Sequence, residues 1–243
     1  MKTNFDNYLF RCSSLGRIVT KSGDLTQDAQ TYLEELFISV VYGVEREIYG
    51  KQLDKGIICE PEGRRMLNLL YPERFVKKNE ERKKNEYIIG THDVIMDDIV
   101  WDIKNAWDLL TFGKAKLSHI YLWQLKGYCF LEKLTKGKLF YCLNNMPEYM
   151  VADEERKMFY FQRKWATMED PEYTKACEEL RAAHNYDKMP LQDRFKIFDV
   201  SFTKADEEKI IACVKQAREY LNGLLKSHNE RIDYNLSLMS VNV

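Results

Sequence analysis

The chain of 243 residues is predicted to fold as an α/β or α+β domain, in which helices flank a small central mixed β-sheet. Three observations lead to this prediction. Two runs rich in β-branched and aromatic residues surround the pair Asp97-Asp98, which is typical of a β-hairpin. Two further runs of strand type, 137–144 and 195–202, follow later in the chain. Segments with helical spacing of apolar residues lie before, between and after these strands.

The other elements follow from periodicity and from residues that start or stop helices. Residues 1–23 are expected to be irregular, and Asp24 or Thr26 can cap the first helix. Gly43 and Gly50 are expected to break that helix into a second short piece. Helices are predicted over 25–42, 61–71, 115–134, 147–164, 171–184 and 205–227. We expect one domain over residues 1–227 and a C-terminal tail over 228–243.

The hairpin has a definite register if Asp97-Asp98 is a two-residue loop. The two strands are expected over 87–96 and 99–104, with Met96 paired to Ile99. Most residues on both faces of these strands are apolar, as in a central strand pair.

The same register sets Asp93 opposite Asp102, and Lys104 lies on the face of Asp102 because side chains alternate along a strand. Two carboxylates across a ladder repel each other, and a divalent cation between them reverses the sign of that interaction. The hairpin therefore predicts a metal site with a lysine beside it. The alternative interpretation is an ordinary solvated face that carries acidic and basic residues.

Composition limits the class of partner. The 37 basic and 38 acidic residues leave a net charge of −1, so affinity for nucleic acid must come from a local patch. The run Arg74–Lys84 holds six basic residues against two acidic ones. It is either a solvated loop or helix end, or a phosphate-contacting edge beside the hairpin.

Location and redox state are also constrained. No apolar run reaches the ~20 residues that cross a bilayer, and the N-terminus lacks a signal-peptide core. We therefore expect no membrane partner and a cytoplasmic location, which is the host cytoplasm if the protein is phage-encoded. The cysteines lack zinc-site spacing and are expected to be reduced and buried; they are Cys12, Cys59, Cys129, Cys142, Cys177 and Cys213.

Four motifs, in order along residues 11–128, together resemble the PD-(D/E)XK nucleases. Gly90-Thr91-His92-Asp93 followed by Asp102-Ile103-Lys104 resembles the signature of that superfamily. Gly56-Ile57-Ile58-Cys59-Glu60 looks like its first motif, a helix-borne glutamate shortly after a glycine. Gln124-Leu125-Lys126-Gly127-Tyr128 looks like the glutamine–tyrosine helix motif of the branch with lambda-type phage exonucleases and RecB-like nuclease domains. Arg11-Cys12-Ser13-Ser14-Leu15-Gly16 is similar to the start of phage alkaline-exonuclease relatives.

The resemblance implies a restriction-endonuclease-like fold with a catalytic hairpin and a set of residue roles. Asp93, Asp102, the Ile103 carbonyl and Glu60 would bind Mg²⁺ or Mn²⁺, which activates a water for attack on phosphate. Lys104 would orient that water or stabilise the charge that develops on phosphorus.

Further roles concern the second helix motif and the N-terminus. Gln124 is implied as a catalytic residue that orients the water, the lysine or a DNA backbone group. Tyr128 would pack or hydrogen-bond behind it and is grouped with the DNA-binding residues. Ser13, Ser14 and Arg17 would contact a terminal phosphate.

The motifs also depart from the family pattern. Asp102 stands where many members have glutamate, a variation that the family name allows. The glutamate of the first motif can be displaced, with Glu45, Glu47 and Glu62 as rivals to Glu60.

Histidine and aromatic residues near the motifs are given structural roles. By alternation His92 faces away from Asp93, so we expect a structural histidine and not a metal ligand. The large aromatic residues nearby are expected in the core, with base stacking as the alternative; they are Trp101, Trp107, Tyr121 and Trp123.

The resemblance therefore implies a Mg²⁺-dependent or Mn²⁺-dependent DNA exonuclease of phage-type recombination or DNA processing. Lambda-type relatives form toroidal trimers, so a homo-oligomer and a single-strand annealing protein are expected as partners beside DNA. Two other functions stay open. One is an endonuclease of the same fold, and the other is a DNA-binding or assembly protein that keeps the fold without hydrolysis.

Overall fold

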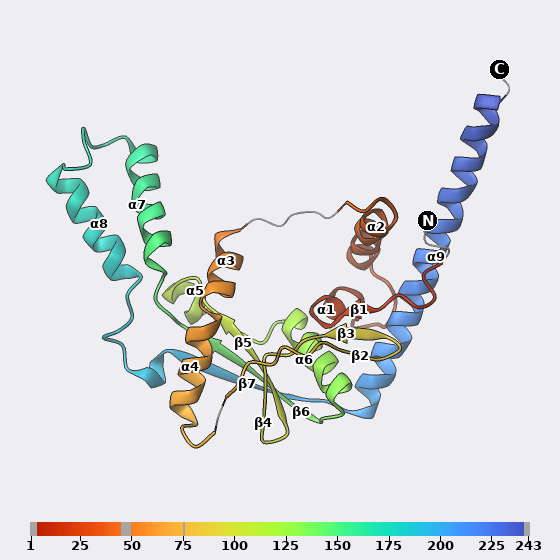
Figure 1. Ribbon diagram of the computed structural model, residues 1–243, viewed down its shortest axis with the longest axis horizontal. Coiled ribbons are helices and arrows are strands. Elements are labelled where there is room, and N and C mark those ends of the chain that lie inside the picture. Colours follow the sequence, from red (N-terminus) through yellow and green to blue (C-terminus); the bar gives the residue numbers. More distant parts are fainter. Residues whose placement is uncertain (1–3, 45–49, 75, 241–243) are drawn as a thin grey trace.

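A four-stranded mixed sheet lies at the centre of the computed structural model, which describes residues 4–44, 50–74 and 76–240 (Figure 1). Its order is β4 (Val94–Met96), β5 (Ile99–Asn105), β6 (Lys136–Cys142) and β7 (Phe195–Ser201). β5 and β6 run parallel, whereas the two outer pairs are antiparallel. Helices cover the sheet, and the predicted fold class is confirmed.

The hairpin has the predicted register. Met96 pairs with Ile99, and both loop residues have left-handed backbone, with φ of 53° at Asp97 and 57° at Asp98. Two-residue loops with positive φ match the twist of the flanking strands, and aspartate tolerates this conformation better than most residues.

The single strand expected over 87–96 is wrong, because the chain divides it between two sheets. β3 (Ile88–Gly90) lies between β1 (Phe10–Arg11) and β2 (Lys83–Lys84) in a second, three-stranded sheet. Only the last three residues, β4, remain in the hairpin. Beyond β4 the carboxylate of Asp93 accepts the N–H of Ile103, an N–H that the backbone of a continuous strand would have bound.

Nine α-helices and two 3₁₀-helices are found in the described ranges. The prediction that 1–23 is irregular is wrong in part, because β1 is followed by η1 (Cys12–Ser14) and α1 (Leu15–Ile18). Two further helices, α3 and α5, were not predicted from the sequence. The short η2 was not predicted either, whereas the other α-helices were predicted to within a few residues, except at the C-terminus. The remaining bounds are α2 Gln27–Tyr42, α3 Lys51–Ile58, α4 Glu60–Leu70, α5 Leu109–Gly113, α6 His119–Glu132, α7 Glu148–Gln162, α8 Pro171–Ala183, η2 Leu191–Asp193 and α9 Lys204–Ser240.

Local chemistry explains where several of these helices begin and end. Thr26 caps α2 through its hydroxyl, and Ser118 caps α6 in the same way. Gly43 ends α2 with φ of 69°, in the left-handed conformation that glycine adopts without strain. The expected short piece after Gly43 carries Glu45 and Glu47, which lie outside the described residues.

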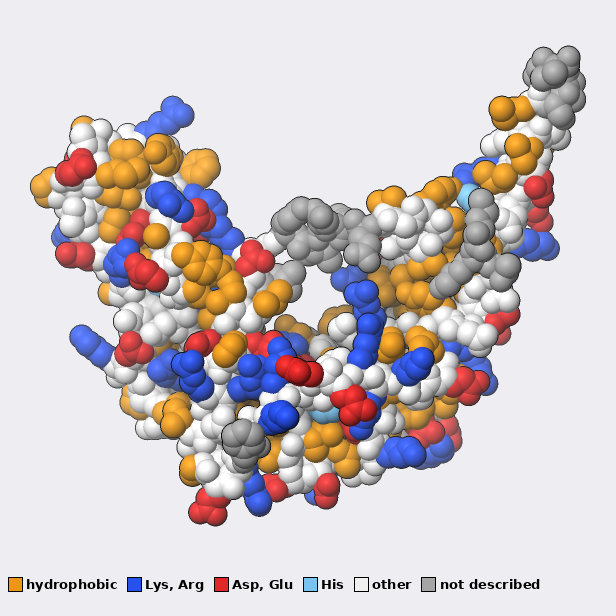
Figure 2. Space-filling model, viewed as in Figure 1, with side chains coloured by type: hydrophobic (Ala, Val, Ile, Leu, Met, Phe, Trp, Pro, Cys, Tyr) orange, Lys and Arg blue, Asp and Glu red, His pale blue; other side chains and the backbone are white. Residues whose placement is uncertain are grey.

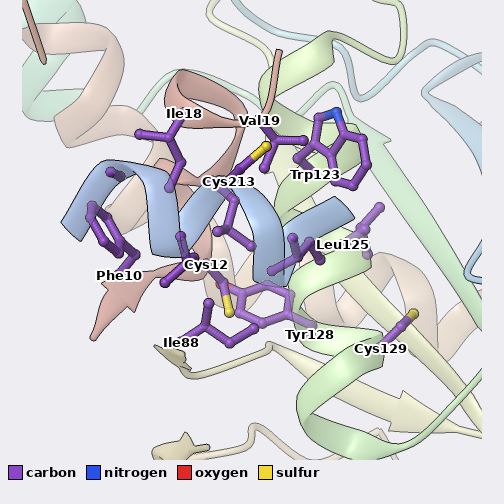
Figure 3. Packing of buried hydrophobic residues seen from close by; sticks show 14 of the residues in the cluster. Phe10, Cys12, Ile18, Val19, Ile88, Trp123, Leu125, Tyr128, Cys129 and Cys213 are labelled. Carbon is purple, nitrogen blue, oxygen red and sulfur yellow. The ribbon is translucent and has the colours of Figure 1, made fainter. Parts of the chain in front are cut away.

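The two faces of the central sheet pack on different helices. Val100 and Leu139 join the larger core with α6 and α9, part of which Figure 3 shows around Cys12, Leu125 and Tyr128. Trp101 and Ile103 point to the other face and pack with Met66 and Leu67 of α4. Consecutive residues of β5 therefore meet α6 and α4 in turn, as strand alternation requires.

Two parts of the chain extend from this centre (Figure 1). α7 and α8 form an antiparallel helical arm on one side, and α9 rises on the other. The helix expected to end at residue 227 continues to Ser240, because no glycine or proline follows Gly223 to stop it. Residues 228–240 are thus helical, and the boundary of the domain at 227 stays a prediction. Within the described ranges, none of the helices has the length and apolar character needed to cross a bilayer.

Candidate active site

Asp102 is the centre of the candidate site. It lies on the face of β5 that meets α6, and only 1% of its surface is exposed. One carboxylate oxygen, Oδ1, accepts hydrogen bonds from Lys104 Nζ (3.0 Å) and from Gln124 Nε2 (3.1 Å). Burial of a carboxylate is tolerated only with such partners. Lys104 and Asp102 thus lie on the same face of β5, as alternation of side chains along a strand predicted.

The second oxygen of Asp102, Oδ2, has fewer partners. The Lys104 ammonium lies 2.8 Å away as an ion pair, but Oδ2 is buried and accepts no hydrogen bond from the described residues. A buried carboxylate oxygen with unused lone pairs is an unsatisfied acceptor. It can accept a further cation or donor.

Asp93 completes an acidic pair at the open end of the hairpin. Its Oδ2 lies 2.7 Å from the backbone nitrogen of Ile103. Burial and the charge of Asp102 raise the pKa of Asp93 to about 7, which identifies the two acids as neighbours. Burial alone would lower the pKa of Lys104, but the carboxylates of Asp102 and Asp93 outweigh it and raise the pKa.

α6 supplies a row of polar contacts to this pair. Gln124 Nε2 also donates to the hydroxyl of Tyr128, 3.0 Å away, so the amide is held between the tyrosine and Asp102. Burial raises the pKa of Tyr128, which stays protonated. Tyr121, one turn before Gln124, lies with its ring 5.4 Å from Lys104 Nζ. No sequence motif indicated this role for Tyr121, although residues 121, 124 and 128 share a helix face.

Glu60 approaches from the other side of the sheet. It starts α4, and α4 touches β5 where Gly63 meets Ile103, so a Cβ at Gly63 would lie 2.7 Å from Ile103 Cγ2. Glu60 Oε1 pairs with Arg64 and with Lys78 Nζ, 3.1 Å away. It is close enough to contribute to the raised pKa of Asp93.

The three acids are not assembled as one ligand group. In residues 4–44, 50–74 and 76–240, no three Asp, Glu, His or Cys side chains gather in a way that could hold a metal ion. The reason is that α4 covers one face of β5 while Asp102 points to the other. The rival Glu62 pairs with exposed Arg65 (3.7 Å), on the surface of α4.

The residues present nevertheless fit a divalent ion in part. Asp93 and Asp102 supply two carboxylates, and Oδ2 of Asp102 is an unsatisfied buried acceptor. The N–H and C=O of a strand residue point to the same edge, so the Ile103 carbonyl faces the side on which Asp93 binds its N–H. Oxygen atoms of this kind are the ligands that Mg²⁺ and Mn²⁺ prefer.

The N-terminal motif packs against the same helix. A Cβ at Gly127 of α6 would lie 2.5 Å from Leu15 Cδ1 and 3.1 Å from Cys12 Sγ, so this glycine permits the close approach. Ser13 and Arg17 are exposed and Ser14 is half-buried. The Arg17 guanidinium lies 5.2 Å from the ring of Tyr32 and lines a pocket of about 510 Å³ together with His119.

His92 lies away from the acidic pair, as predicted. Its Nδ1 is 3.1 Å from Glu132 Oε1, and its ring meets that of Tyr128 edge to face. Trp101 and Trp123 are buried, in agreement with a core role.

The basic run around residues 74–84 contributes ion pairs near the site. Lys78 pairs with Glu60, Lys83 pairs with buried Glu132 (2.6 Å), and Arg74 pairs with Asp97 of the hairpin loop (3.1 Å). Exposed cations also remain in the run, namely Lys77, Arg82 and Lys84.

A buried lysine that no sequence motif indicated connects α3 to this region. Lys55 Nζ donates to the carbonyls of Trp107 (2.8 Å) and Asn144 (2.9 Å), just beyond β5 and β6. Asn105, at the end of β5, donates to Gly56 of α3 and accepts from Asn144. A lysine among apolar helix residues gives no sequence signal of its partners, since both acceptors are distant backbone carbonyls.

Comparison with known proteins detects similarity in structure. No family model matches the chain, and no curated protein matches its sequence. The chain is similar to a phage-related exonuclease from Haemophilus somnus 129PT, with a TM-score of 0.72 and 19% identity over 91% of this chain and 97% of the other. It is also similar to an alkaline exonuclease from Laribacter hongkongensis, with a TM-score of 0.57 and 12% identity over 93% and 95% of the two chains. For the complex of that exonuclease with dAMP, the TM-score is 0.60, with 12% identity over 93% and 94%. The chain thus shares its fold with these proteins along most of its length.

Proposed function

We propose that the chain is a metal-dependent DNA exonuclease of the PD-(D/E)XK class, active in phage-type recombination or DNA processing. The observation that carries this proposal is the buried Asp102 carboxylate, held by Lys104 and Gln124 next to Asp93. A buried carboxylate that is paired with a half-buried lysine and has an oxygen without a hydrogen bond is costly for a purely structural purpose. Its cost is understandable in a site that performs chemistry.

Asp93, Asp102 and the Ile103 carbonyl would hold Mg²⁺ or Mn²⁺, with Glu60 as the nearest further carboxylate. The chemistry that such an ion supplies when bound is Lewis acidity toward a phosphodiester and toward the water that attacks it. Both ion pairs of Glu60, with Arg64 and with Lys78, use Oε1, so a ligand role would fall to Oε2 or would displace these cations.

The other residues act on charge and orientation. The raised pKa keeps Lys104 protonated, so its ammonium can stabilise negative charge on a phosphoryl oxygen or orient the water. Gln124 fixes the Asp102 carboxylate through Oδ1, and Tyr128 in turn fixes the amide of Gln124. Ser13, Ser14 and Arg17, on the segment that packs on α6, would contact a terminal phosphate.

The likeness to exonuclease structures supports this function, since one of those enzymes is seen in complex with dAMP. A homo-oligomer, such as a trimer, and a single-strand annealing partner stay predictions. A closed ring would give a chain of net charge −1 a grip on DNA that does not depend on attraction alone.

The test is degradation of linear duplex DNA with Mg²⁺, Mn²⁺ or EDTA. Wild type should degrade linear DNA only with metal and leave covalently closed circles intact. Asp102→Ala and Lys104→Ala should each lower the rate at least about 100-fold. Asp199→Ala, which removes an exposed aspartate of β7, is the matched control and should keep the rate.

Each rival function has its own outcome. Cleavage of closed circles would identify an endonuclease of the same fold. Retardation of DNA on a gel without loss under any metal would identify a binding protein. Full activity of Asp102→Ala would exclude this carboxylate from the reaction.

A further inference from the structure

The end of the α7–α8 arm has an unusual local composition. The ten residues Arg156–Trp165 contain four cations, four aromatic residues and no acidic residue, in a chain whose net charge is −1. None of them belongs to the candidate active site. Basic side chains interleaved with aromatic rings are the combination that binds single-stranded nucleic acid.

The arm holds part of this aromatic set in place. Tyr173 of α8 is buried, and its hydroxyl donates to the backbone carbonyl of Glu155 on α7 (3.0 Å). Its ring lies 5.2 Å from the rings of both Phe159 and Trp165. Arg181 of α8 adds an ion pair to Glu155 (2.6 Å). The two helices are thus joined by a small aromatic core of their own.

Two neighbouring rings lie outside that core. Tyr160 is 63% exposed and Phe161 is 81% exposed, at the last turn of α7. The ring of Tyr160 packs edge to face on Phe159, with 5.4 Å between centroids, and Phe159 in turn packs on Tyr173. Large exposed rings on a supported surface offer flat faces on which bases can stack.

Cations surround these rings. Arg156 and Lys157 share Asp153 as an acidic partner, and Lys51 of α3 pairs with both Asp153 and Glu154. These three cations thus face two carboxylates, which leaves one positive charge in excess. Arg163 and Lys164 are exposed, and Arg163 ends α7 in the left-handed conformation (φ 49°). Figure 2 shows hydrophobic and basic side chains together at the upper end of this arm.

A groove begins beside these residues, since Arg156 is part of its lining. It encloses about 420 Å³ between α7 and α3, and its lining includes Tyr149 and Arg156 of α7 with Ile57 and Ile58 of α3. Two carboxylates, of Asp54 and Asp153, and the ammonium of Lys51 also line it. Ile58 lies two residues before Glu60. The space-filling view shows the surface hollowed beside the arm on this side of the molecule.

We propose that the end of the α7–α8 arm binds single-stranded DNA, with bases stacked on Tyr160 and Phe161 and phosphates bound by the four cations. The groove then leads the strand along α3 toward the acidic pair. A single strand is favoured over duplex DNA because only unpaired bases expose their faces for stacking. The inference deepens the proposed function, on which it rests for the direction of the strand.

The test is binding of a fluorescent single-stranded oligonucleotide, measured by anisotropy in EDTA so that no hydrolysis takes place. The double variant Tyr160→Ala/Phe161→Ala should bind at least about 10-fold more weakly than wild type. Tyr160→Trp/Phe161→Trp should keep the affinity, because the rings are retained. Tyr234→Ala on α9 removes an equally exposed tyrosine (63%) and should have no effect.

The cations have a separate readout. Arg163→Ala/Lys164→Ala should make the negative slope of log affinity against log salt less steep by about 1 to 1.5, since two phosphate contacts are lost. Lys215→Ala, which removes an exposed lysine of α9, should leave the slope unchanged. Tyr160→Ala/Phe161→Ala should lose less affinity for duplex DNA than for the single strand, because paired bases do not expose their faces for stacking.

Several outcomes overturn the inference. One is a wild type that does not bind the oligonucleotide, and another is a double alanine variant with wild-type affinity. An equal loss in Tyr234→Ala also overturns it. A changed sedimentation coefficient with unchanged DNA affinity would instead identify the arm as a protein interface. Because binding is measured without metal, a chain that degrades no DNA but binds through Tyr160 and Phe161 would refute the proposed function alone.

Discussion

At the scale of single residues, burial decides what the charged groups near the sheet can do. Lys55 is 1% exposed, and burial lowers its pKa to about 8, against weaker opposing effects of Cys59 and Asp108. Its ammonium donates to two carbonyls and, among the residues that the structure describes, pairs with no carboxylate. Lys104 has the opposite shift because two carboxylates face it. The first lysine positions α3, and the second is part of the candidate active site.

Lys55 predicts a pH dependence of stability. In the folded chain it loses its proton near pH 8, and in the unfolded chain near pH 10.5. Between these values the unfolded state binds more protons, so the free energy of unfolding rises with pH. Relative to Lys55→Met, wild type should gain roughly 3 kcal/mol from pH 8 to pH 10.5. Urea unfolding at a series of pH values measures the difference.

The matched control is Lys215→Met, which replaces an exposed lysine of α9 and should follow the wild-type profile. Parallel pH profiles for wild type and Lys55→Met would show that Lys55 keeps its ordinary pKa in the folded chain.

At the scale of elements, one glycine sets the distance between α4 and the hairpin. Gly63 faces Ile103, the residue between Asp102 and Lys104. Glu60 lies one turn before Gly63, so the same contact sets how far this glutamate is from Asp93. Gly90 and Gly127 have similar roles, because both allow Cys12 to pack closely.

Gly63→Ala should therefore destabilise the fold. The new Cβ would lie 2.7 Å from Ile103 Cγ2, an atom fixed close to the β5 backbone, so α4 must move. We expect the free energy of unfolding to fall by about 1–3 kcal/mol, despite the better helix propensity of alanine. Nuclease activity should fall as well, because Glu60 moves with α4. Chemical denaturation and the linear-DNA assay measure the two effects.

Gly223→Ala is the control, since nothing lies within 4 Å of a Cβ at this position of α9. It should raise the stability by up to about 1 kcal/mol through helix propensity alone. A similar gain from Gly63→Ala would mean that α4 does not need this close approach.

At the scale of the whole molecule, α9 joins the N-terminal and C-terminal parts of the chain. Its first half is buried against the core, and Leu225 and His228 are its last buried residues. The ring of His228 meets those of Phe37 and Tyr42 on α2. Beyond this point almost every described side chain of α9 is exposed.

Truncations should separate the two halves of α9. Removal of residues 233–243 should change the midpoint of thermal unfolding by only a few degrees, because little apolar surface leaves the core. Removal of residues 225–243 takes buried Leu225 out of the core and removes the contacts of His228 with α2, and it should lower the midpoint clearly more. Equal effects of the two truncations would contradict this division of the helix.

The sequence by itself determined much of the local structure. Apolar periodicity and prolines at helix starts predicted six of the helices, and the two-residue loop predicted the register of Met96 with Ile99. Alternation along β5 also predicted that Lys104 shares the face of Asp102. These features depend on neighbours in the sequence, so a period of 2 or 3.6 residues is enough to recognise them.

Only the tertiary structure decided which faces meet. The run 87–96 enters two different sheets. The side chain of Asp93 accepts the N–H of Ile103, for which a backbone carbonyl of a continuous strand was the expected acceptor. α6 covers the face of Asp102, whereas α4 brings Glu60 to the opposite face. Periodicity tells which residues share a face, but it contains no information about which distant helix packs on that face. Contacts such as those of Gly63 and Lys55 form between segments far apart in the chain, and packing decides them.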